Sequence, residues 1–340
     1  MKRVVEAWDR FQIPLYITAL IAGALVGLQW PGSTGGFEIA INPALMALLY
    51  ATFLGIPITR IGTALKDLRF LTVLMSVNFV AVPLVAFALS RFIAGDEALL
   101  IGFLLVILAP CIDYVIVFAG LARAAQDKLL AATPILMLVQ ILLIPVFLAV
   151  FVGSDTLGSI SFGPFVEAFF LLILIPLVAA AGTQQVARKW QVGRTIMAAA
   201  EAIMVPLMML TLFVVIASQV EAVSDQFTDI ATVVPLYVAF LMVMIPIGGG
   251  MSKLGGLGFK EQRAIVFSGA TRNSLVVLPL ALALPAGLEI AAVVVVTQTL
   301  VELVGMVVYV RIIPLIFHEK QTCRKLSGIG GVMKQNGKLR

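Results

Sequence analysis

The sequence predicts an all-α polytopic membrane protein with ten transmembrane helices, arranged as two inverted five-helix repeats. The first observation is composition: 61% of the 340 residues are hydrophobic and 12% are charged, whereas soluble domains carry about 25% charged residues. The second is that the apolar residues form long continuous runs, unlike the alternating strands of a membrane barrel. Because backbone groups in lipid must hydrogen-bond within their own segment, each run predicts a helix.

Each predicted span is long enough for the roughly 20 residues that cross a hydrocarbon layer of about 30 Å. The spans occupy residues 11–29, 39–59, 70–90, 98–121, 129–151, 164–186, 196–219, 230–250, 264–284 and 288–317. The connection after the fifth span is the longest on its side, so the chain divides into a first five-helix repeat at 1–151, a second at 164–317 and a basic tail at 318–340. With five spans in each half, the second half enters the membrane from the opposite side, which is the condition for an inverted repeat.

The basic residues alternate with the predicted spans. All of the 23 Lys and Arg residues except Arg91 and Arg272 lie in or beside the termini and the loops of one side. Because positive charge marks the cytoplasmic side, we expect a multi-pass protein of the cell (inner) membrane with both termini cytoplasmic. The net charge of +5 then reflects topology rather than nucleic-acid binding, and the tail is expected to contact anionic lipid.

Polar side chains inside the spans are the candidate site, because an ionisable group at the membrane centre costs roughly 2.5–3.5 kcal/mol. Most of them lie in the fourth, ninth and tenth spans, with one glutamine in the fifth. They are Pro110, Cys111, Asp113, Tyr114, Gln140, Thr271, Arg272, Asn273, Ser274, Gln298 and Glu302.

Pro110 predicts a break in the fourth helix, because proline lacks an N–H and clashes with the carbonyl four residues earlier. The polar residues 271–274 predict a second break at the matching place in the other half. Freed carbonyls and helix N-termini bind ions and anions, so two matched breaks predict a binding site between them. The alternatives are that Pro110 only kinks its helix and that Cys111 is inert packing.

Asp113 and Arg272 carry opposite charges at matching places in the two halves. Because a buried charge needs a partner, we predict that they pair where the two breaks meet. Glu302 is then the group that binds and releases a proton in each transport cycle. Glu201, near the start of its span, is expected to lie at the membrane interface.

Three motifs carry a resemblance to a known family: APCIDYVIVFAGLA at 109–122, ATRNSLVVLPLALALP at 270–285 and VVTQTLVELVG at 295–305. With these motifs, and over nearly its whole length, the chain resembles the bile acid:sodium symporter superfamily and, within it, the arsenite efflux permeases. The resemblance implies two inverted five-helix repeats sorted into a panel and a core. It also implies that the fourth and ninth helices are unwound and cross.

The resemblance also implies roles for individual residues. Cys111 matches the functional cysteine of the arsenite permeases, Thr271 and Asn273 match their ninth-span polar cluster, and Glu302 matches their tenth-span glutamate. The chain departs from the arsenite pattern elsewhere. Pro110 stands where those permeases have Arg, Phe118 where they have Trp and Leu275 where they have Glu, while Asp113 and Arg272 are additional charges.

The leading expectation for function is export of arsenite or antimonite in exchange for protons, with no cofactor. The Cys111 thiol suits As(III) or Sb(III) as substrate, because soft centres favour sulfur. The alternative is sodium-coupled uptake of a small organic anion whose carboxylate meets Arg272. A membrane enzyme would need a convergent histidine and carboxylates, and the one histidine, His318, lies past the last span. The expected partners are a small inorganic or organic anion or metalloid substrate and membrane lipid. The protein is expected to be a monomer or a homodimer.

Overall fold

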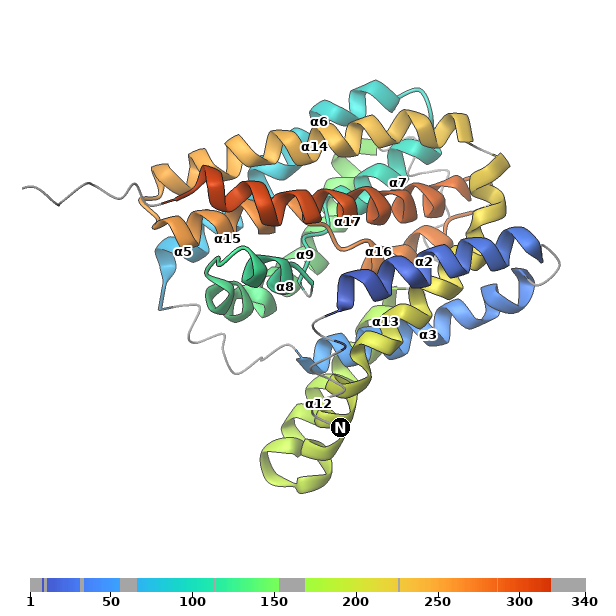
Figure 1. Cartoon of the computed structure of the whole chain (residues 1–340), viewed down its shortest axis with the longest axis horizontal. Helices are drawn as coiled ribbons and strands as arrows, with labels where there is room; N and C mark the ends of the chain where they lie inside the picture. Colours follow the sequence, from blue (N-terminus) through green and yellow to red (C-terminus); the bar gives the residue numbers. More distant parts are fainter. Residues whose placement is uncertain are drawn as a thin grey trace, which may run out of the picture.

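The computed structural model describes residues 8, 11–30, 34–55, 66–112, 114–152, 169–225, 227–285 and 287–318. Nearly all of them are helical, as the sequence predicts (Figure 1). In this part of the chain, five helices are long and apolar enough to cross a membrane, and shorter apolar helices accompany them. The chain is therefore an all-helical, multi-pass membrane protein.

The elements follow the predicted spans in order. They are α2 (Gln12–Gln29), α3 (Thr34–Gly55), α5 (Leu68–Ser76), the π-helical turn η3 (Val77–Ala81), α6 (Val82–Ser90), the short η4 (Arg91–Ile93), α7 (Glu97–Ile107), α8 (Tyr114–Leu121), α9 (Gln126–Val152), η5 (Phe169–Leu174), α12 (Ile175–Lys189), α13 (Gln191–Asp225), α14 (Phe227–Leu254), α15 (Phe259–Ala270), α16 (Ser274–Leu282) and α17 (Ile290–Ile316). The ends of the predicted spans at 56–59 and 164–168, and the tail at 319–340, lie outside the described residues.

Two elements differ in detail from the predicted spans. Helix α13 has 35 residues, about 52 Å at 1.5 Å per residue, and so extends well past the predicted 196–219 into its polar flanks. The third span is continuous through η3, which ends at Ala81, two residues before Pro83. Proline cannot donate a backbone hydrogen bond, and the wider π turn accommodates this gap within one helix.

The helices pack in two groups (Figure 1). The first group consists of α2, α3, α12 and α13, in which α13 lies along both α2 and α3. Gly23 makes this packing close, because a Cβ there would lie 2.6 Å from the carbonyl oxygen of Phe213. The second group contains α5 to α9 and α14 to α17, in which α17 packs against α7, α14 and α16.

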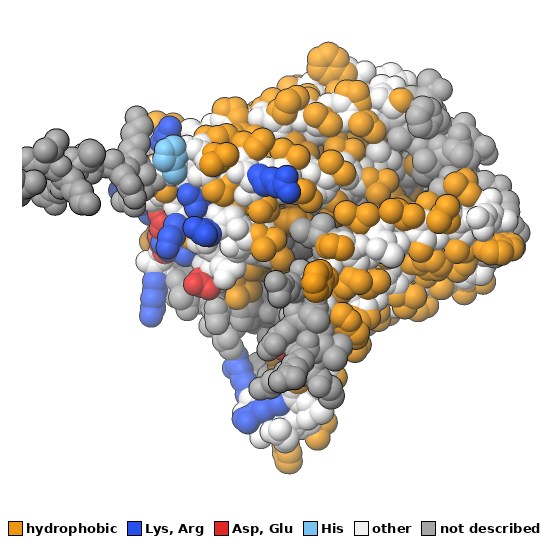
Figure 2. Space-filling view, viewed as in Figure 1, with side chains coloured by type: hydrophobic (Ala, Val, Ile, Leu, Met, Phe, Trp, Pro, Cys, Tyr) orange, Lys and Arg blue, Asp and Glu red, His pale blue; other side chains and the backbone are white. Residues whose placement is uncertain are grey.

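Apolar side chains cover much of the face seen in Figure 2, and most Lys and Arg side chains in this view gather at one end and at the tip of α12. Large exposed residues such as Leu84, Leu142 and Leu315 lie along the long helices. A soluble monomer rarely exposes apolar patches of this extent, so this surface faces lipid. The charged end is where an aqueous face begins.

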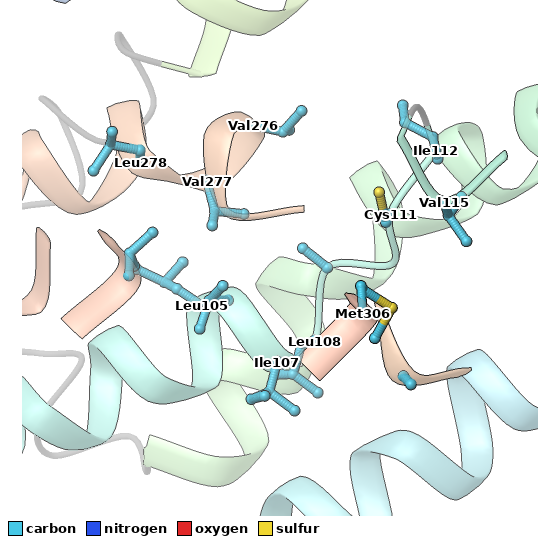
Figure 3. Packing of buried hydrophobic residues seen from close by; sticks show 14 of the residues in the cluster. Leu105, Ile107, Leu108, Cys111, Ile112, Val115, Val276, Val277, Leu278 and Met306 are labelled. Atoms are coloured by element: carbon cyan, nitrogen blue, oxygen red, sulfur yellow. The ribbon is translucent and has the colours of Figure 1, made fainter. Parts of the chain in front are cut away.

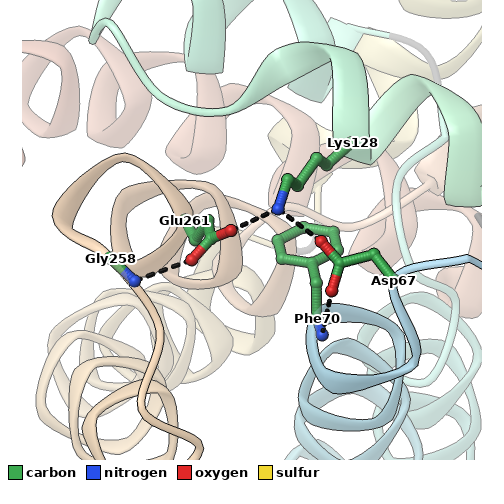
Figure 4. Close-up of polar contacts among 5 residues, drawn as sticks. All are labelled: Asp67, Phe70, Lys128, Gly258 and Glu261. Atoms are coloured by element: carbon green, nitrogen blue, oxygen red, sulfur yellow. Dashed lines mark hydrogen bonds and ion pairs between the residues drawn. The ribbon is translucent and has the colours of Figure 1, made fainter.

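An ion-pair network at the charged end joins three helices (Figure 4). Lys128 of α9 bonds to Asp67 and to Glu261. Asp67 also caps α5 by accepting from the Phe70 N–H at 3.1 Å, and Glu261 accepts from the Gly258 N–H at 2.7 Å before α15. The network therefore holds the starts of α5, α9 and α15 together.

We expect Lys128→Met to lower the free energy of unfolding by about 0.5–1 kcal/mol near neutral pH, because the partners are partly exposed. The hydrogen bond from Lys128 lowers the pKa of Asp67 below its ordinary 3.8. A lowered carboxyl pKa stabilises the fold above the unfolded-state pKa, and the stabilisation is lost as pH falls through the folded-state pKa. Thermal unfolding against pH should therefore show the difference between wild type and variant shrinking below about pH 4. Exposed Lys253→Met is the control, and an equal effect of Lys128→Met at every pH would contradict the prediction.

Candidate functional site

Two interrupted helices meet inside the bundle. Helix α7 ends at Ile107 and α8 begins at Tyr114, while α15 ends at Ala270 and α16 begins at Ser274. The two connecting segments run antiparallel, with Pro110 opposite Arg272. The Cys111 N–H donates to the Thr271 carbonyl at 3.2 Å, and the Asn273 N–H donates to the Ala109 carbonyl at 2.8 Å. We call this region the crossing.

Four helix ends of opposite polarity converge at the crossing. The C-terminal ends of α7 and α15 carry partial negative charge, and the N-terminal ends of α8 and α16 carry partial positive charge. Pro110 has no N–H and so cannot continue the hydrogen bonds of its own helix. The backbone N–H of Arg272 donates to Glu302 Oε2 at 2.8 Å.

The side chain of Arg272 is completely buried, and its guanidinium lies on oxygen atoms of both C-terminal helix ends. It donates to the carbonyl of Ile107 at 3.2 Å, to those of Ser268 and Gly269 at 2.6 and 2.8 Å, and to Asn78 Oδ1 at 3.0 Å. The positive charge thus meets the negative ends of α7 and α15. The predicted partner Asp113 lies outside the described residues, so that pairing stays a prediction.

Asn78 and Ser268 complete the surroundings of Arg272. The Asn78 amide nitrogen donates to Leu74 O within its own helix and to Ser268 Oγ, each at 3.0 Å. Sequence analysis missed Ser268, although it lies four residues before Arg272, one helical turn away. Asn78 is a polar residue within an apolar span, but only the fold brings it to Arg272.

Helix α17 supplies the acidic side of the site. Glu302 is 1% exposed, and its Oε2 accepts from the Gln298 amide as well as from the Arg272 backbone. One helical turn away, Thr299 bonds to Ser274 at the start of α16, with 2.6 Å between the hydroxyl oxygens. Helix α17 therefore holds both the crossing and the first residue of α16.

Asn273 caps α16, because its Oδ1 accepts from the Val276 N–H at 3.2 Å. Its amide nitrogen is buried and has no hydrogen-bond partner within the described part of the chain. A buried unpaired donor is costly, so it is a candidate contact for a ligand. Together the structure brings Cys111, Thr271, Arg272, Asn273, Ser274, Gln298 and Glu302 to the crossing.

The remaining candidates are placed less fully. Cys111 is buried on the segment between α7 and α8, next to Ile112, while Val277 of α16 points toward Leu105 of α7 (Figure 3). Tyr114 begins α8, and nothing is described of its side chain. Gln140 is buried within α9.

A cavity of about 350 Å³ lies beside the crossing, between the two helix groups. The unwound segment contributes Ile112, and α8 contributes Ile116 and Val117. The walls from α3, α9 and α13 are mainly apolar, with Thr52 and Glu201 as the polar members. The sequence predicts Glu201 to lie at the membrane interface, and only the fold, in which α13 and α8 line the same cavity, shows that this side chain is part of its wall.

Interrupted helices that meet inside an apolar bundle are a design of secondary transporters, and comparison with known families gives the same class. The family model of the sodium bile acid symporter family matches residues 42–226, more than half of the chain. The chain belongs to the sodium bile acid symporter family, whose members are transporters. None of the curated proteins matches it.

Proposed function

We propose that the protein is a sodium-coupled symporter of a small organic anion. The observation that carries this proposal is the start of α16 at the crossing, where the buried amide nitrogen of Asn273 has no hydrogen-bond partner among the described residues and lies beside the first N–H groups of the helix. Helix N-termini favour anions. A substrate carboxylate held there would satisfy the Asn273 donor and use the positive end of the helix.

The neighbouring cavity suits the rest of such a substrate. Ligand cavities typically have volumes of about 300–1,000 Å³ with mainly apolar walls and few polar groups, and the cavity of about 350 Å³ agrees with this. Ile112, on the unwound segment, and Ile116 of α8 both line the cavity wall. An apolar body would occupy the cavity while the carboxylate faces the start of α16.

Arg272 is not the carboxylate-binding group in this proposal. Its guanidinium already donates to three carbonyls and to Asn78, and its side chain is fully buried. Turning it toward a substrate would leave those carbonyls unpaired in an apolar interior, which costs about 1–3 kcal/mol for each. The substrate carboxylate is therefore assigned to the start of α16.

Alternating access would occur by movement of the two helix groups against each other. The cavity beside the crossing has a volume of about 350 Å³, whereas the gap lined by Leu20, Leu212 and Ser274 on α2, α13 and α16 has a volume of about 10 Å³. In this conformation the cavity therefore offers a substrate the more room. The proposal includes the ten spans and the two inverted repeats, 1–151 and 164–317.

Uptake of radiolabelled cholate and benzoate into proteoliposomes tests the proposal. We expect an inward sodium gradient to raise the initial rate and Asn273→Asp to raise KM roughly tenfold or more, since a hydrogen bond to a charged group contributes about 1.5–3 kcal/mol. Aspartate keeps the helix cap but replaces the donor by a like charge.

Glu201→Gln is the matched variant, for which we expect KM to change in the opposite direction. Removing a negative charge from the cavity wall should lower KM for either anion about two- to fivefold, a small effect because this side chain is solvent-exposed. No sodium stimulation, or an unchanged KM in Asn273→Asp, would contradict the proposed function.

Export of arsenite or antimonite against protons is the second candidate, favoured by one observation. The Cys111 thiol lies at the crossing, next in sequence to Ile112 of the cavity wall. Arsenite accumulation by everted membrane vesicles, with and without a proton gradient, tests it. Gradient-driven accumulation that disappears in Cys111→Ser would establish this candidate, and no accumulation by the folded protein would favour the organic anion.

A further inference from the structure

The surroundings of the Arg272 guanidinium resemble the coordination shell of a metal cation. Four oxygen atoms lie within 3.2 Å of its nitrogens: the carbonyls of Ile107, Ser268 and Gly269, and Asn78 Oδ1. All of these residues are buried. The ring of Phe240 closes one further side, with its centroid 5.6 Å from the guanidinium carbon, which adds a cation–π contact.

These oxygens would attract a cation whatever its identity. Three of them belong to the C-terminal ends of α7 and α15, where unpaired carbonyls and the helix dipoles concentrate negative charge. In transporters with interrupted helices, such carbonyls and half-helix C-terminal ends coordinate the coupling cation. Here the carboxylate of Glu302 is also attached to the crossing, through the backbone N–H of Arg272.

We propose that Arg272 is a tethered cation that permanently occupies a cation site at the crossing, so that sodium does not bind among these oxygens in the wild-type protein. Arginine suits this role because its guanidinium is always charged and presents five donors in a fixed geometry. The coupling sodium of the proposed symport would then bind elsewhere. The protein would bind one dissociable cation fewer than a transporter whose crossing lacks this arginine. The inference goes beyond the proposed function, because it concerns which cation holds the crossing.

Removing the guanidinium should uncover a sodium site. Arg272→Ala leaves three carbonyls and Asn78 Oδ1 around an empty volume, and hard cations prefer such oxygen ligands. Thermal unfolding of the purified protein in sodium chloride and in potassium chloride of equal ionic strength measures the effect. We expect sodium to raise the unfolding temperature of Arg272→Ala by roughly 2–4 °C more than that of the wild type when it is present at ten times its dissociation constant.

Three further variants make the test specific. Arg272→Gln also lacks the charge and should gain the same sodium response, so it replaces Arg272→Ala if that protein does not fold. Arg272→Lys keeps a cation near the carbonyls and should gain no response. Adding Asn78→Ala to Arg272→Ala should abolish the gained response, because it removes the one side-chain oxygen of the site.

The proposal is overturned if neither neutral variant gains a sodium response over the wild type, or if Arg272→Lys gains it equally. In either case Arg272 would be a structural hydrogen-bond donor rather than a substitute for an ion. The measurement needs no substrate and no transport. Its failure is therefore distinct from a failure of the organic-anion proposal, which is decided by uptake into proteoliposomes.

Discussion

Glu302→Ala is expected to lower the free energy of unfolding by about 2–6 kcal/mol, because it leaves two buried donors unpaired at about 1–3 kcal/mol each. These donors are the Arg272 backbone N–H and the Gln298 amide, which both bond to Glu302 Oε2. The loss reaches the crossing directly, since Arg272 loses the contact that joins it to α17. Thermal or chemical unfolding of the purified protein measures the effect.

Glu302→Gln separates stability from transport. Glutamine keeps the shape and a carbonyl oxygen that can accept from Arg272, so stability should fall much less than in the alanine variant. It cannot bind and release a proton. In the proton-coupled second candidate function, transport should therefore fall by roughly 100-fold or more, the size of loss typical when a group central to the mechanism is removed, whereas sodium-coupled uptake does not require this proton. Exposed Glu97→Gln is the control, and full activity of Glu302→Gln would remove Glu302 from the mechanism.

Gly102→Val is expected to destabilise the protein by about 1–3 kcal/mol through overpacking. A Cβ at Gly102 in α7 would lie 2.7 Å from the carbonyl oxygen of Ala291 and 2.8 Å from its Cα, and these are backbone atoms of α17 that cannot move aside alone. The two helices must separate to admit the side chain. Since α7 ends five residues later at Ile107, where Arg272 is bound, transport should fall as well.

The control is Gly250 of α14, beside which an added Cβ meets open space. Gly250→Ala should leave stability unchanged or raise it by about 0.5–1 kcal/mol, because alanine favours the helix. Unfolding temperatures of Gly102→Val, Gly102→Ala and Gly250→Ala distinguish the two environments. Equal effects at both positions would show that α7 and α17 do not pack as closely as the structure places them.

Much of the architecture follows from sequence alone, because lipid imposes simple rules on it. Long apolar runs must be helices, since backbone groups in hydrocarbon have no other hydrogen-bond partners. The interruptions in these runs were predictable for the same reason: Pro110 and the polar residues 271–274 cannot continue an apolar helix unless other atoms satisfy them. The structure interrupts the helices at these places.

The partners of the site residues were not predictable in this way. The pairing of Arg272 with Asp113, expected because a buried charge needs a partner, stays a prediction, since Asp113 lies outside the described residues. The described contacts show that backbone carbonyls also bind the guanidinium, and these are invisible in a sequence because every residue has one. The carboxylate of Glu302 likewise accepts from the backbone N–H of Arg272, a donor that every residue except proline carries.

The sequence by itself determined the membrane class, the helical segments, the two interruptions and the set of buried polar residues, because each depends on local composition and on the cost of burying polar groups. Only the tertiary structure decided that Ser268 and Asn78 lie beside Arg272, that Glu201 lines the cavity, and that the Asn273 amide nitrogen finds no partner in the described part of the chain. These features depend on which helix faces meet. Close packing between segments far apart in the chain, as between Gly102 and Ala291, decides which faces meet. The sequence of one apolar span does not show which other span packs against it.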